Sequence, residues 1–183
     1  MSGEEVLGFA QRSPIKAIGD CYCRKTYGNK NNLPMKTCLW FSDSVILEDL
    51  LQKDGMRNLN LAKVSYDEIK RTLEECEKVG LVHQTVYFPS KDTVYVICNC
   101  HPSSCVMLQG MIKYGVKSVV KSNFKVSFSR DTCIGCGKCV ERCYFGANIE
   151  KGKRIEYNYL KCFGCGLCVT SCPTKSRILV RRD

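Results

Sequence analysis

Two runs of cysteines near the end of the chain have a spacing that suits metal chemistry. Each run reads C-x2-C-x2-C-x3-C, and the second repeats the first at an offset of 29 residues. The first contains Cys133, Cys136, Cys139 and Cys143, and the second contains Cys162, Cys165, Cys168 and Cys172. Three cysteines spaced in this way can wrap a tight loop around one face of an iron–sulfur cubane, so that each thiolate reaches a different iron. The repeat therefore predicts one structural unit used twice, with thiolates as iron ligands.

The segment that contains both runs, residues 131–180, resembles the two-[4Fe–4S] ferredoxin fold of the bacterial type. The resemblance implies that the fourth cysteine of each run ligates the other cluster. It assigns Cys133, Cys136, Cys139 and Cys172 to one cluster, and Cys162, Cys165, Cys168 and Cys143 to the other. A zinc ribbon is a poor rival, because its C-x2-C pairs lack the third and fourth cysteines. One departure is that Tyr144 follows Cys143, where the pattern has the proline seen at Pro173.

Seven cysteines lie outside these runs. Cys76 falls on the apolar side of a predicted helix, and we expect it to be a small core residue. The other six form two groups, Cys21, Cys23 and Cys38, then Cys98, Cys100 and Cys105. We expect these groups, in loops or at strand ends, to meet in one metal site. Its predicted ligands come from Cys21, Cys23, Cys38, Cys98 and Cys100, with Cys105 and His101 as further candidates.

Three interpretations of this N-terminal site stay open. A third [4Fe–4S] cluster is preferred, because it fits the neighbouring clusters and the number of thiols. A structural zinc site is the first alternative, since thiolate zinc sites tolerate many spacings. Reactive or core thiols without metal are the second. The C-x-C spacing does not decide, because we expect alternating side chains to diverge unless they lie in a turn.

Most of the chain, residues 20–180, resembles a family of ferredoxin-type proteins of anaerobic bacteria and archaea. Four motifs before the ferredoxin segment carry the resemblance: "CYCR" at 21–24, "CLWF" at 38–41, "GLVHQT" at 80–85 and "ICNC" at 97–100. The resemblance implies a redox role without a settled activity. Relatives continue "CNC" with more adjacent cysteines, whereas "HPSSC" stands here, so the pool of ligands is smaller.

The expected fold class is α+β. Residues 129–183 would form the two-[4Fe–4S] ferredoxin domain, fused to a cysteine-rich α/β domain over residues 1–128. In the latter, "SYDEIKRTLEECEKVG" predicts a helix with a capping box of Ser65 and Glu68. The next segment predicts a β-hairpin with "PSKD" as its turn, so that helix and hairpin together look winged-helix-like. Residues 1–64 are expected to be loop-rich.

Composition narrows the class of protein. The chain has 183 residues, 15 cysteines and a net charge of +10. Its N-terminus does not read as a signal peptide, and no apolar run approaches the roughly 18 to 20 residues that span a bilayer. A cytoplasmic location is therefore expected, where dense cysteine indicates metal or redox chemistry rather than structural disulfides.

The positive charge is unevenly distributed and suggests a partner. Basic residues without intervening acids are Lys113, Lys117, Lys121, Lys125 and Arg130, and Arg177, Arg181 and Arg182 crowd the C-terminus. A solvated face is the simpler interpretation, and a docking surface for an acidic redox partner is the sharper one. Nucleic acid is an unfavourable partner, because the helix at 66–79 carries more acids than bases. The sequence leaves the oligomeric state open.

Three functions are consistent with these patterns. The preferred one is an electron-transfer protein that relays electrons through its clusters to or from a larger oxidoreductase. The alternative is a reductase whose N-terminal cysteine site acts on a substrate. A redox-sensing DNA-binding regulator is the least favoured. Ligand saturation at the N-terminal site separates the first two: a full set of thiolates favours a relay, and an open position or a free thiol pair favours catalysis.

Overall fold

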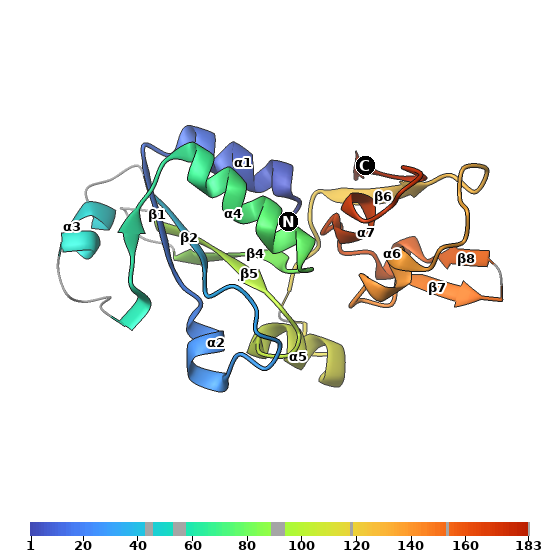
Figure 1. Cartoon of the computed structure of the whole chain (residues 1–183), viewed down its shortest axis with the longest axis horizontal. Coiled ribbons are helices and arrows are strands. Elements are labelled where there is room, and N and C mark those ends of the chain that lie inside the picture. The colour runs from blue at the N-terminus through green and yellow to red at the C-terminus, as the bar shows by residue number, and fades with distance from the viewer. Residues whose placement is uncertain (43–45, 53–57, 89–93, 118, 153, 183) are drawn as a thin grey trace.

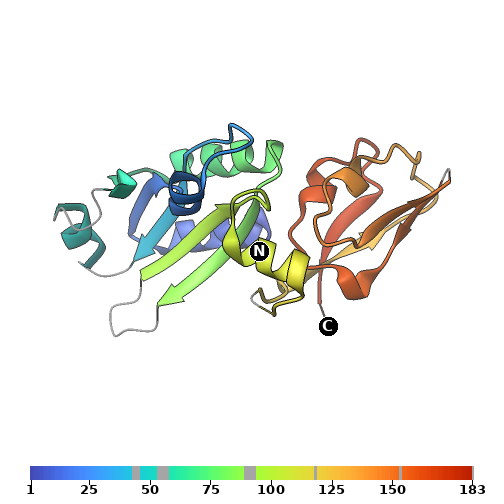
Figure 2. The same ribbon diagram turned by 90° about the horizontal axis from the view of Figure 1, so that it is seen from below.

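The computed structural model describes residues 1–42, 46–52, 58–88, 94–117, 119–152 and 154–182. Its described part forms two lobes, which lie side by side in both Figure 1 and Figure 2. The N-terminal lobe contains an antiparallel sheet, and the C-terminal lobe contains two small two-stranded sheets. The fold is thus a mixture of helix and strand, as the α+β prediction requires.

The sheet of the N-terminal lobe has the strand order β3-β1-β2-β5-β4 among the described residues. Its strands are β1 (Ile15–Asp20), β2 (Lys36–Ser42), β3 (Ala62–Lys63), β4 (Val82–Phe88) and β5 (Val94–Cys100). The helices around it are α1 (Gly3–Arg12), α2 (Tyr22–Tyr27), α3 (Ile46–Gln52), α4 (Tyr66–Lys78) and α5 (Val106–Tyr114). The prediction that residues 1–64 are loop-rich is wrong, because β1 and the central strand β2 come from this segment.

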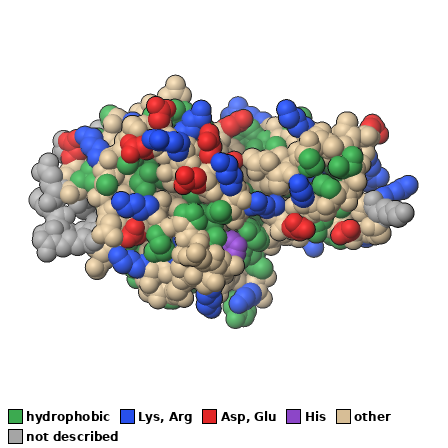
Figure 3. Space-filling model, viewed as in Figure 1, with side chains coloured by type: hydrophobic (Ala, Val, Ile, Leu, Met, Phe, Trp, Pro, Cys, Tyr) green, Lys and Arg blue, Asp and Glu red, His purple; other side chains and the backbone are tan. Residues whose placement is uncertain are grey.

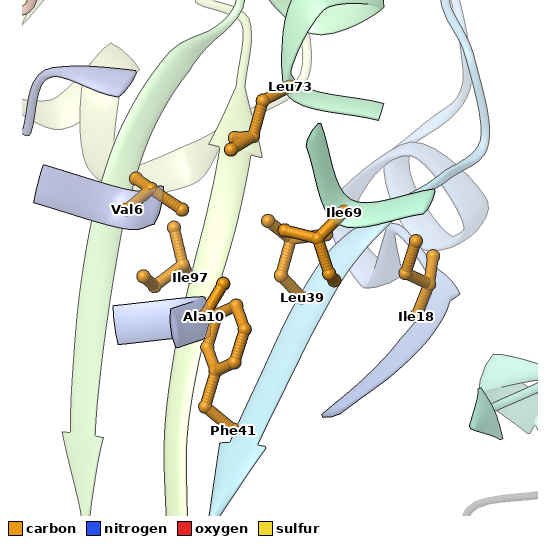
Figure 4. Packing of buried hydrophobic residues seen from close by; sticks show 8 residues of the cluster. All are labelled: Val6, Ala10, Ile18, Leu39, Phe41, Ile69, Leu73 and Ile97. Carbon is orange, nitrogen blue, oxygen red and sulfur yellow. The ribbon is translucent and has the colours of Figure 1, made fainter. Parts of the chain in front are cut away.

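One face of the sheet packs against α1 and α4. In strand register, Ile18 lies opposite Leu39, and Leu39 lies opposite Ile97, so these side chains point to the same side. Val6 and Ala10 of α1, and Ile69 and Leu73 of α4, cover them (Figure 4). This apolar cluster is the main core of the N-terminal lobe.

A large aromatic side chain in this core allows a stability test. Phe41 is fully buried in the cluster, so Phe41→Ala is expected to lower the free energy of unfolding by about 3–5 kcal/mol. Anaerobic urea unfolding followed by circular dichroism measures the change. Val86→Ala on β4 is the matched control, because Val86 is 41% exposed and should change stability by less than about 0.5 kcal/mol. Equal losses in the two variants would contradict this placement of the core.

The helix–hairpin element predicted from the sequence is present. Ser65 and Glu68 form the capping box of α4, and Gly80 follows the helix with a φ of 83°. Strands β4 and β5 pair from Val82 opposite Cys100 onward, while the "PSKD" turn lies outside the described residues. The hairpin is part of the larger sheet, and the likeness to a winged helix stays a prediction.

The C-terminal lobe is built around the repeat. Its elements are β6 (Phe124–Phe128), α6 (Lys138–Glu141), β7 (Asn148–Lys151), β8 (Arg154–Tyr157), the 3-10 turn η2 (Tyr159–Lys161), α7 (Leu167–Thr170) and β9 (Arg177–Arg181). Helices α6 and α7 occupy equivalent positions in the two halves. Between the halves, "EKGKRIEY" contains a Lys-Gly pair that is typical of a turn, and the β7–β8 hairpin forms there. Because β6 pairs with β9, residues 124–128 belong structurally with this lobe. The division of the chain at residues 128 and 129 stays a prediction.

Hydrogen bonds from the first half of the repeat join the two lobes. Arg142 donates to the carbonyl oxygens of Glu77, at 3.4 Å, and of Lys78. The Tyr144 hydroxyl donates to the carbonyl oxygen of Gly80 at 2.9 Å. A Cβ atom at residue 80 would lie 2.7 Å from the Arg142 guanidinium and 2.9 Å from the Tyr144 hydroxyl. Glycine at this position therefore permits the close approach of the lobes.

Candidate metal centres

The first candidate centre is an enclosed cavity in the C-terminal lobe. The cysteines that line it are Cys133, Cys136, Cys139 and Cys172. Cys172 comes from the second run, and the crossing cysteine of the first run, Cys143, is not among the lining residues. The four thiols that the ferredoxin resemblance groups together thus face one space.

The second candidate centre gathers the other four cysteines of the repeat. Burial raises the pKa of the Cys165 thiol to about 11 and that of Cys168 to about 12, and a nearby Cys143 adds to both shifts. Cys162 acts on Cys165 in the same way. Cys143 therefore lies close to thiols of the second run. Buried thiols with raised pKa values favour metal ligation over free thiolates, because a bound metal ion stabilises the deprotonated form.

Backbone amides point at two of these sulfurs. The N–H of Ala147 donates to Sγ of Cys143 at 3.3 Å, and the N–H of Gly164 donates to Sγ of Cys162 at 3.4 Å. Gly164 has a φ of 70°, and a Cβ there would lie 2.0 Å from the carbonyl oxygen of Phe124. Only glycine fits between the cysteine loop and β6. Donors of this kind stabilise thiolate and cluster sulfur.

The third candidate centre lies in the N-terminal lobe and contains all six cysteines of the two N-terminal groups. Neighbouring thiols influence each other's pKa values in a continuous order: Cys21 and Cys38, Cys38 and Cys98, Cys98 and Cys100, Cys100 and Cys105, and Cys105 and Cys23. Segments far apart in the sequence thus contribute to one continuous chain of sulfurs. The predicted ligands are brought together, and Cys105 joins them.

Strand register explains how the sheet presents three of these thiols. Leu39 lies opposite Ile97, so the next position along the two strands places Cys38 beside Cys98. Residues two apart in a strand point to the same side, so Cys98 and Cys100 share the face opposite α1 and α4. The expectation that a C-x-C pair diverges outside a turn is wrong for this reason.

Two short helices supply the remaining thiols. Cys21 and Cys105 are the N-cap residues of α2 and α5, and Cys23 lies in the first turn of α2. Cys21 and Cys38 are each only 6% exposed, so these positions are buried. Cys76 is buried in α4, and burial raises the pKa of its thiol to about 12, as expected for a core residue.

Two thiols of the third centre have lowered pKa values. Hydrogen bonds from Cys100 and Cys38 lower the pKa of Cys98 to about 4. Hydrogen bonds from Cys100 and Cys23, with the backbone amides at the start of α5, lower the pKa of Cys105 to about 2. The deprotonated form is therefore favoured at Cys98 and at Cys105.

A buried arginine lies beside the third centre. Arg24 is 2% exposed, and its guanidinium donates to the Asn99 carbonyl oxygen at 3.2 Å and to the Thr37 hydroxyl. No carboxylate among the described residues forms an ion pair with it. Its positive charge acts on the Cys21 thiol and lowers the pKa of that group, against larger opposing effects. Because a buried charge needs compensation, this cation suits an anionic thiolate site.

The network around Arg24 includes residues that sequence reasoning missed. The side-chain amide Nδ2 of Asn99 donates to the backbone carbonyl oxygen of Thr37 at 2.6 Å. The side-chain oxygen Oδ1 of Asn99 contacts Nδ1 of the fully buried His83. Arg24, His83 and Asn99 belong to the "CYCR", "GLVHQT" and "ICNC" motifs. The motifs carried the signal, but the contact between them appears only in the folded chain.

Zinc is the alternative metal for the third centre. Within the described ranges, no group of three or more His, Cys, Asp or Glu side chains converges on a position for one metal ion. A tetrahedral zinc site needs its sulfurs about 2.3 Å from a single ion, whereas a cubane distributes four thiolates over four irons. His101 offers little to such a site, because its Nδ1 accepts a hydrogen bond from the Ser103 amide at 3.1 Å. Zinc at the third centre stays an alternative, which metal analysis of the protein tests.

The second and third centres share one apolar cluster. Cys98, Cys100 and Cys105 pack in the same cluster as Cys165 and Tyr144. The Tyr144 ring also meets His101 edge-on, with 5.3 Å between ring centroids. Tyr144, the departure from the ferredoxin pattern, therefore lies where the repeat meets the N-terminal site.

Comparison with known protein families identifies the C-terminal lobe. Residues 126–180 match the family model of the 4Fe-4S dicluster domain. This lobe is a ferredoxin-type 4Fe–4S domain, and iron–sulfur electron transfer is the chemistry that it supports. A search of curated proteins found no significant match to the chain. None of the described helices is long and apolar enough to cross a membrane.

The basic surface expected from the sequence needs one correction. Arg177 is 1% exposed and cannot contribute to a surface patch. Arg182 is held by the carbonyl oxygens of Ser122, at 2.9 Å, and Cys162, at 2.6 Å. On the face shown in Figure 3, basic side chains are spread over both lobes, with acidic ones between them.

Proposed function

We propose that this protein relays electrons to or from a larger oxidoreductase through three [4Fe–4S] clusters. Two would be held by the eight cysteines of the repeat, with Cys143 and Cys172 as the crossing ligands. The third would be held by four of the six N-terminal thiols. Such clusters supply one-electron chemistry with little change in geometry. A reducing, cytoplasmic location is part of the proposal, because it suits so many unpaired thiols.

The observation that carries this proposal is the continuity of the sulfur-rich core. Three of the six thiols, those of Cys98, Cys100 and Cys105, pack in the apolar cluster that contains Cys165. Burial of Cys21, Cys38, Cys100 and Cys105 leaves little room for a substrate at the thiols themselves. Close packing without substrate access favours a relay over catalysis.

The side chains of the protein have clear tasks in such a relay. Arg24 compensates negative charge at the N-terminal thiols, and the apolar cluster around Cys165 excludes water between the second and third centres. At the first centre, Cys136 is exposed and the neighbouring Ile134 is 67% exposed. Electrons would therefore enter or leave the C-terminal lobe near these residues.

The redox partner is proposed to be acidic. Helix α5 and its exit carry the exposed side chains of Lys113 and Lys117 beside Tyr114, which is 79% exposed. The sequence contains no Asp or Glu from residue 93 to residue 130. Cys105 caps the same helix, so a partner docked here would approach the third centre. Opposite charge would speed the encounter and make it sensitive to salt.

An electron count tests the function. Dithionite-reduced protein, freed of excess reductant, should return about one electron per cluster to a one-electron acceptor of much higher potential, such as oxidised cytochrome c, under anaerobic conditions. The absorbance of the iron–sulfur chromophore should recover fully over repeated cycles. Protein that contains clusters but returns no electrons, or loses its iron after one cycle, would contradict an electron-transfer role.

A cleft keeps the reductase alternative open. It has a volume of about 660 Å³, runs between α1, β4 and residues 119–123, and has Cys165 and Phe163 in its wall. A substrate in this cleft would lie beside a cysteine of the second centre. DNA binding has no such support, because the exposed side chains of α4 include Asp67, Glu68, Glu74 and Glu75.

A further inference from the structure

The two halves of the C-terminal repeat differ in the residues next to their crossing cysteines. At the offset of 29 residues, Thr174, Ser176 and Arg177 correspond to Phe145, Ala147 and Asn148. One half thus has two hydroxyls and a guanidinium where the other has a ring, a methyl group and a neutral amide. The approximate symmetry of the unit makes this difference directly comparable.

Arg177 is buried without a polar partner for its two terminal nitrogens. It is 1% exposed, its Cζ lies 4.1 Å from the centre of the Phe128 ring, and it lines the cavity of the first centre. Among the described residues, neither Nη1 nor Nη2 has a hydrogen-bond partner. Burying such a donor and charge is costly unless a negative group compensates it.

Equivalent residues act on equivalent cysteines. Arg177 lines the same cavity as Cys139 and the other three cysteines of the first centre. In the second half, the neutral Asn148 interacts with Cys168 at the matching position. The guanidinium therefore favours negative charge chiefly at the first centre.

The hydroxyl groups add to this asymmetry. Sγ of Cys172 lies 3.2 Å from Oγ of Ser176 and 3.8 Å from Oγ1 of Thr174. The apolar Phe145 and Ala147 side chains offer no such hydroxyl to Cys143.

We propose that Arg177, assisted by Ser176 and Thr174, makes the cluster bound by Cys133, Cys136, Cys139 and Cys172 the easier of the two ferredoxin-type clusters to reduce. The proposal rests on the two-cluster assignment. One-electron reduction adds a negative charge, which a buried cation and hydroxyl donors stabilise. Electrons that reach the second centre near Cys165 would then pass mainly to the first centre, which contains the exposed Cys136.

A potential measurement with a matched variant tests this asymmetry. Arg177→Asn gives the first half the amide that the second half has at Asn148. In an anaerobic redox titration followed by EPR, with dithionite as the electron source, the easier ferredoxin-type couple should become harder to reduce. Its ratio of reduced to oxidised cluster at fixed potential should fall at least about tenfold, which is about 59 mV for one electron. The other couple should move less.

Controls separate the local effect from loss of charge or of clusters. Arg181→Asn removes the same charge from an exposed position on the same strand and should leave the spacing of the couples unchanged. Arg177→Lys keeps the positive charge and should change the potential of the easier couple only slightly. If Arg177→Asn binds less iron, the potential of Arg177→Lys decides whether the proposal holds. Unchanged couples in Arg177→Asn, or equal shifts in Arg177→Asn and Arg181→Asn, would overturn the proposal. Wild-type protein without two ferredoxin-type couples would instead overturn the cluster assignment itself.

Discussion

Changing Cys98 to serine is expected to remove about four iron atoms from each chain and to leave the ferredoxin-type clusters in place. Cys98 is the central thiol of the N-terminal site, because it interacts with Cys21, Cys38, Cys100 and Cys105. Serine keeps the size of the side chain but is a poor ligand for iron at neutral pH. Iron and sulfide analysis of anaerobically purified protein measures the loss.

The control for this change is Cys76→Ala. Cys76 is also fully buried in the N-terminal lobe but takes no part in the chain of thiols, so the variant should keep its full iron content. Six thiols offer replacements for a lost ligand, and Cys38→Ser/Cys98→Ser therefore removes both thiols that the central strands present side by side. Full iron in this double variant would contradict ligation by Cys38 and Cys98, and would leave Cys21, Cys23, Cys100 and Cys105 as the ligands.

The crossing ligands give the second large effect. We expect Cys143→Ala to lose about four iron atoms per chain, from the cluster that the second run binds. Adding Cys162→Ala should cause little further loss, because both cysteines would serve one cluster. Adding Cys133→Ala should remove about four more, because Cys133 would serve the other cluster.

The reverse pattern would show that each run binds its own cluster. In that case the double variant Cys143→Ala/Cys133→Ala would lose no more iron than either single variant. Cys172→Ala gives the corresponding test for the other cluster. Adding Cys133→Ala to it should cause little further loss of iron, whereas adding Cys162→Ala should remove about four more iron atoms. EPR of the reduced variants should show the loss of one interacting partner in each single variant.

Much of the C-terminal lobe could be predicted, because its information is local. The cysteine spacing and its repeat indicated the ferredoxin-type domain, and "EKGKRIEY" indicated the hairpin β7–β8. The capping box at Ser65 and the β4–β5 hairpin were equally local signals. In each case the residues that determine the element lie within a few positions of one another.

The N-terminal site depended on information that is not local. Strand β2 reads as a short stretch between polar turns, and its place beside β1 and β5 follows from burial on both faces of the sheet. The contact of Cys38 with Cys98 follows from that pairing, and a register shifted by one residue would point the thiol at α4 instead. The sequence could group the six cysteines but could not show which thiols touch.

Two single residues took on meaning only in the structure. Tyr144 departs from the proline of the ferredoxin pattern, and it bonds to Gly80 and meets His101 where the lobes join. Arg177 read as one of several basic residues at the C-terminus, whereas it is buried against the first centre. Neither pattern nor composition distinguishes a buried arginine from an exposed one.

Anaerobic determination of iron, sulfide and zinc in the purified wild-type protein tests the central claim most directly. Three [4Fe–4S] clusters predict about 12 iron and about 12 sulfide per chain, without zinc. EPR of the fully reduced protein should show interacting clusters. About 8 iron per chain would contradict a third cluster, and about one zinc in addition would indicate a structural zinc ion at the N-terminal thiols.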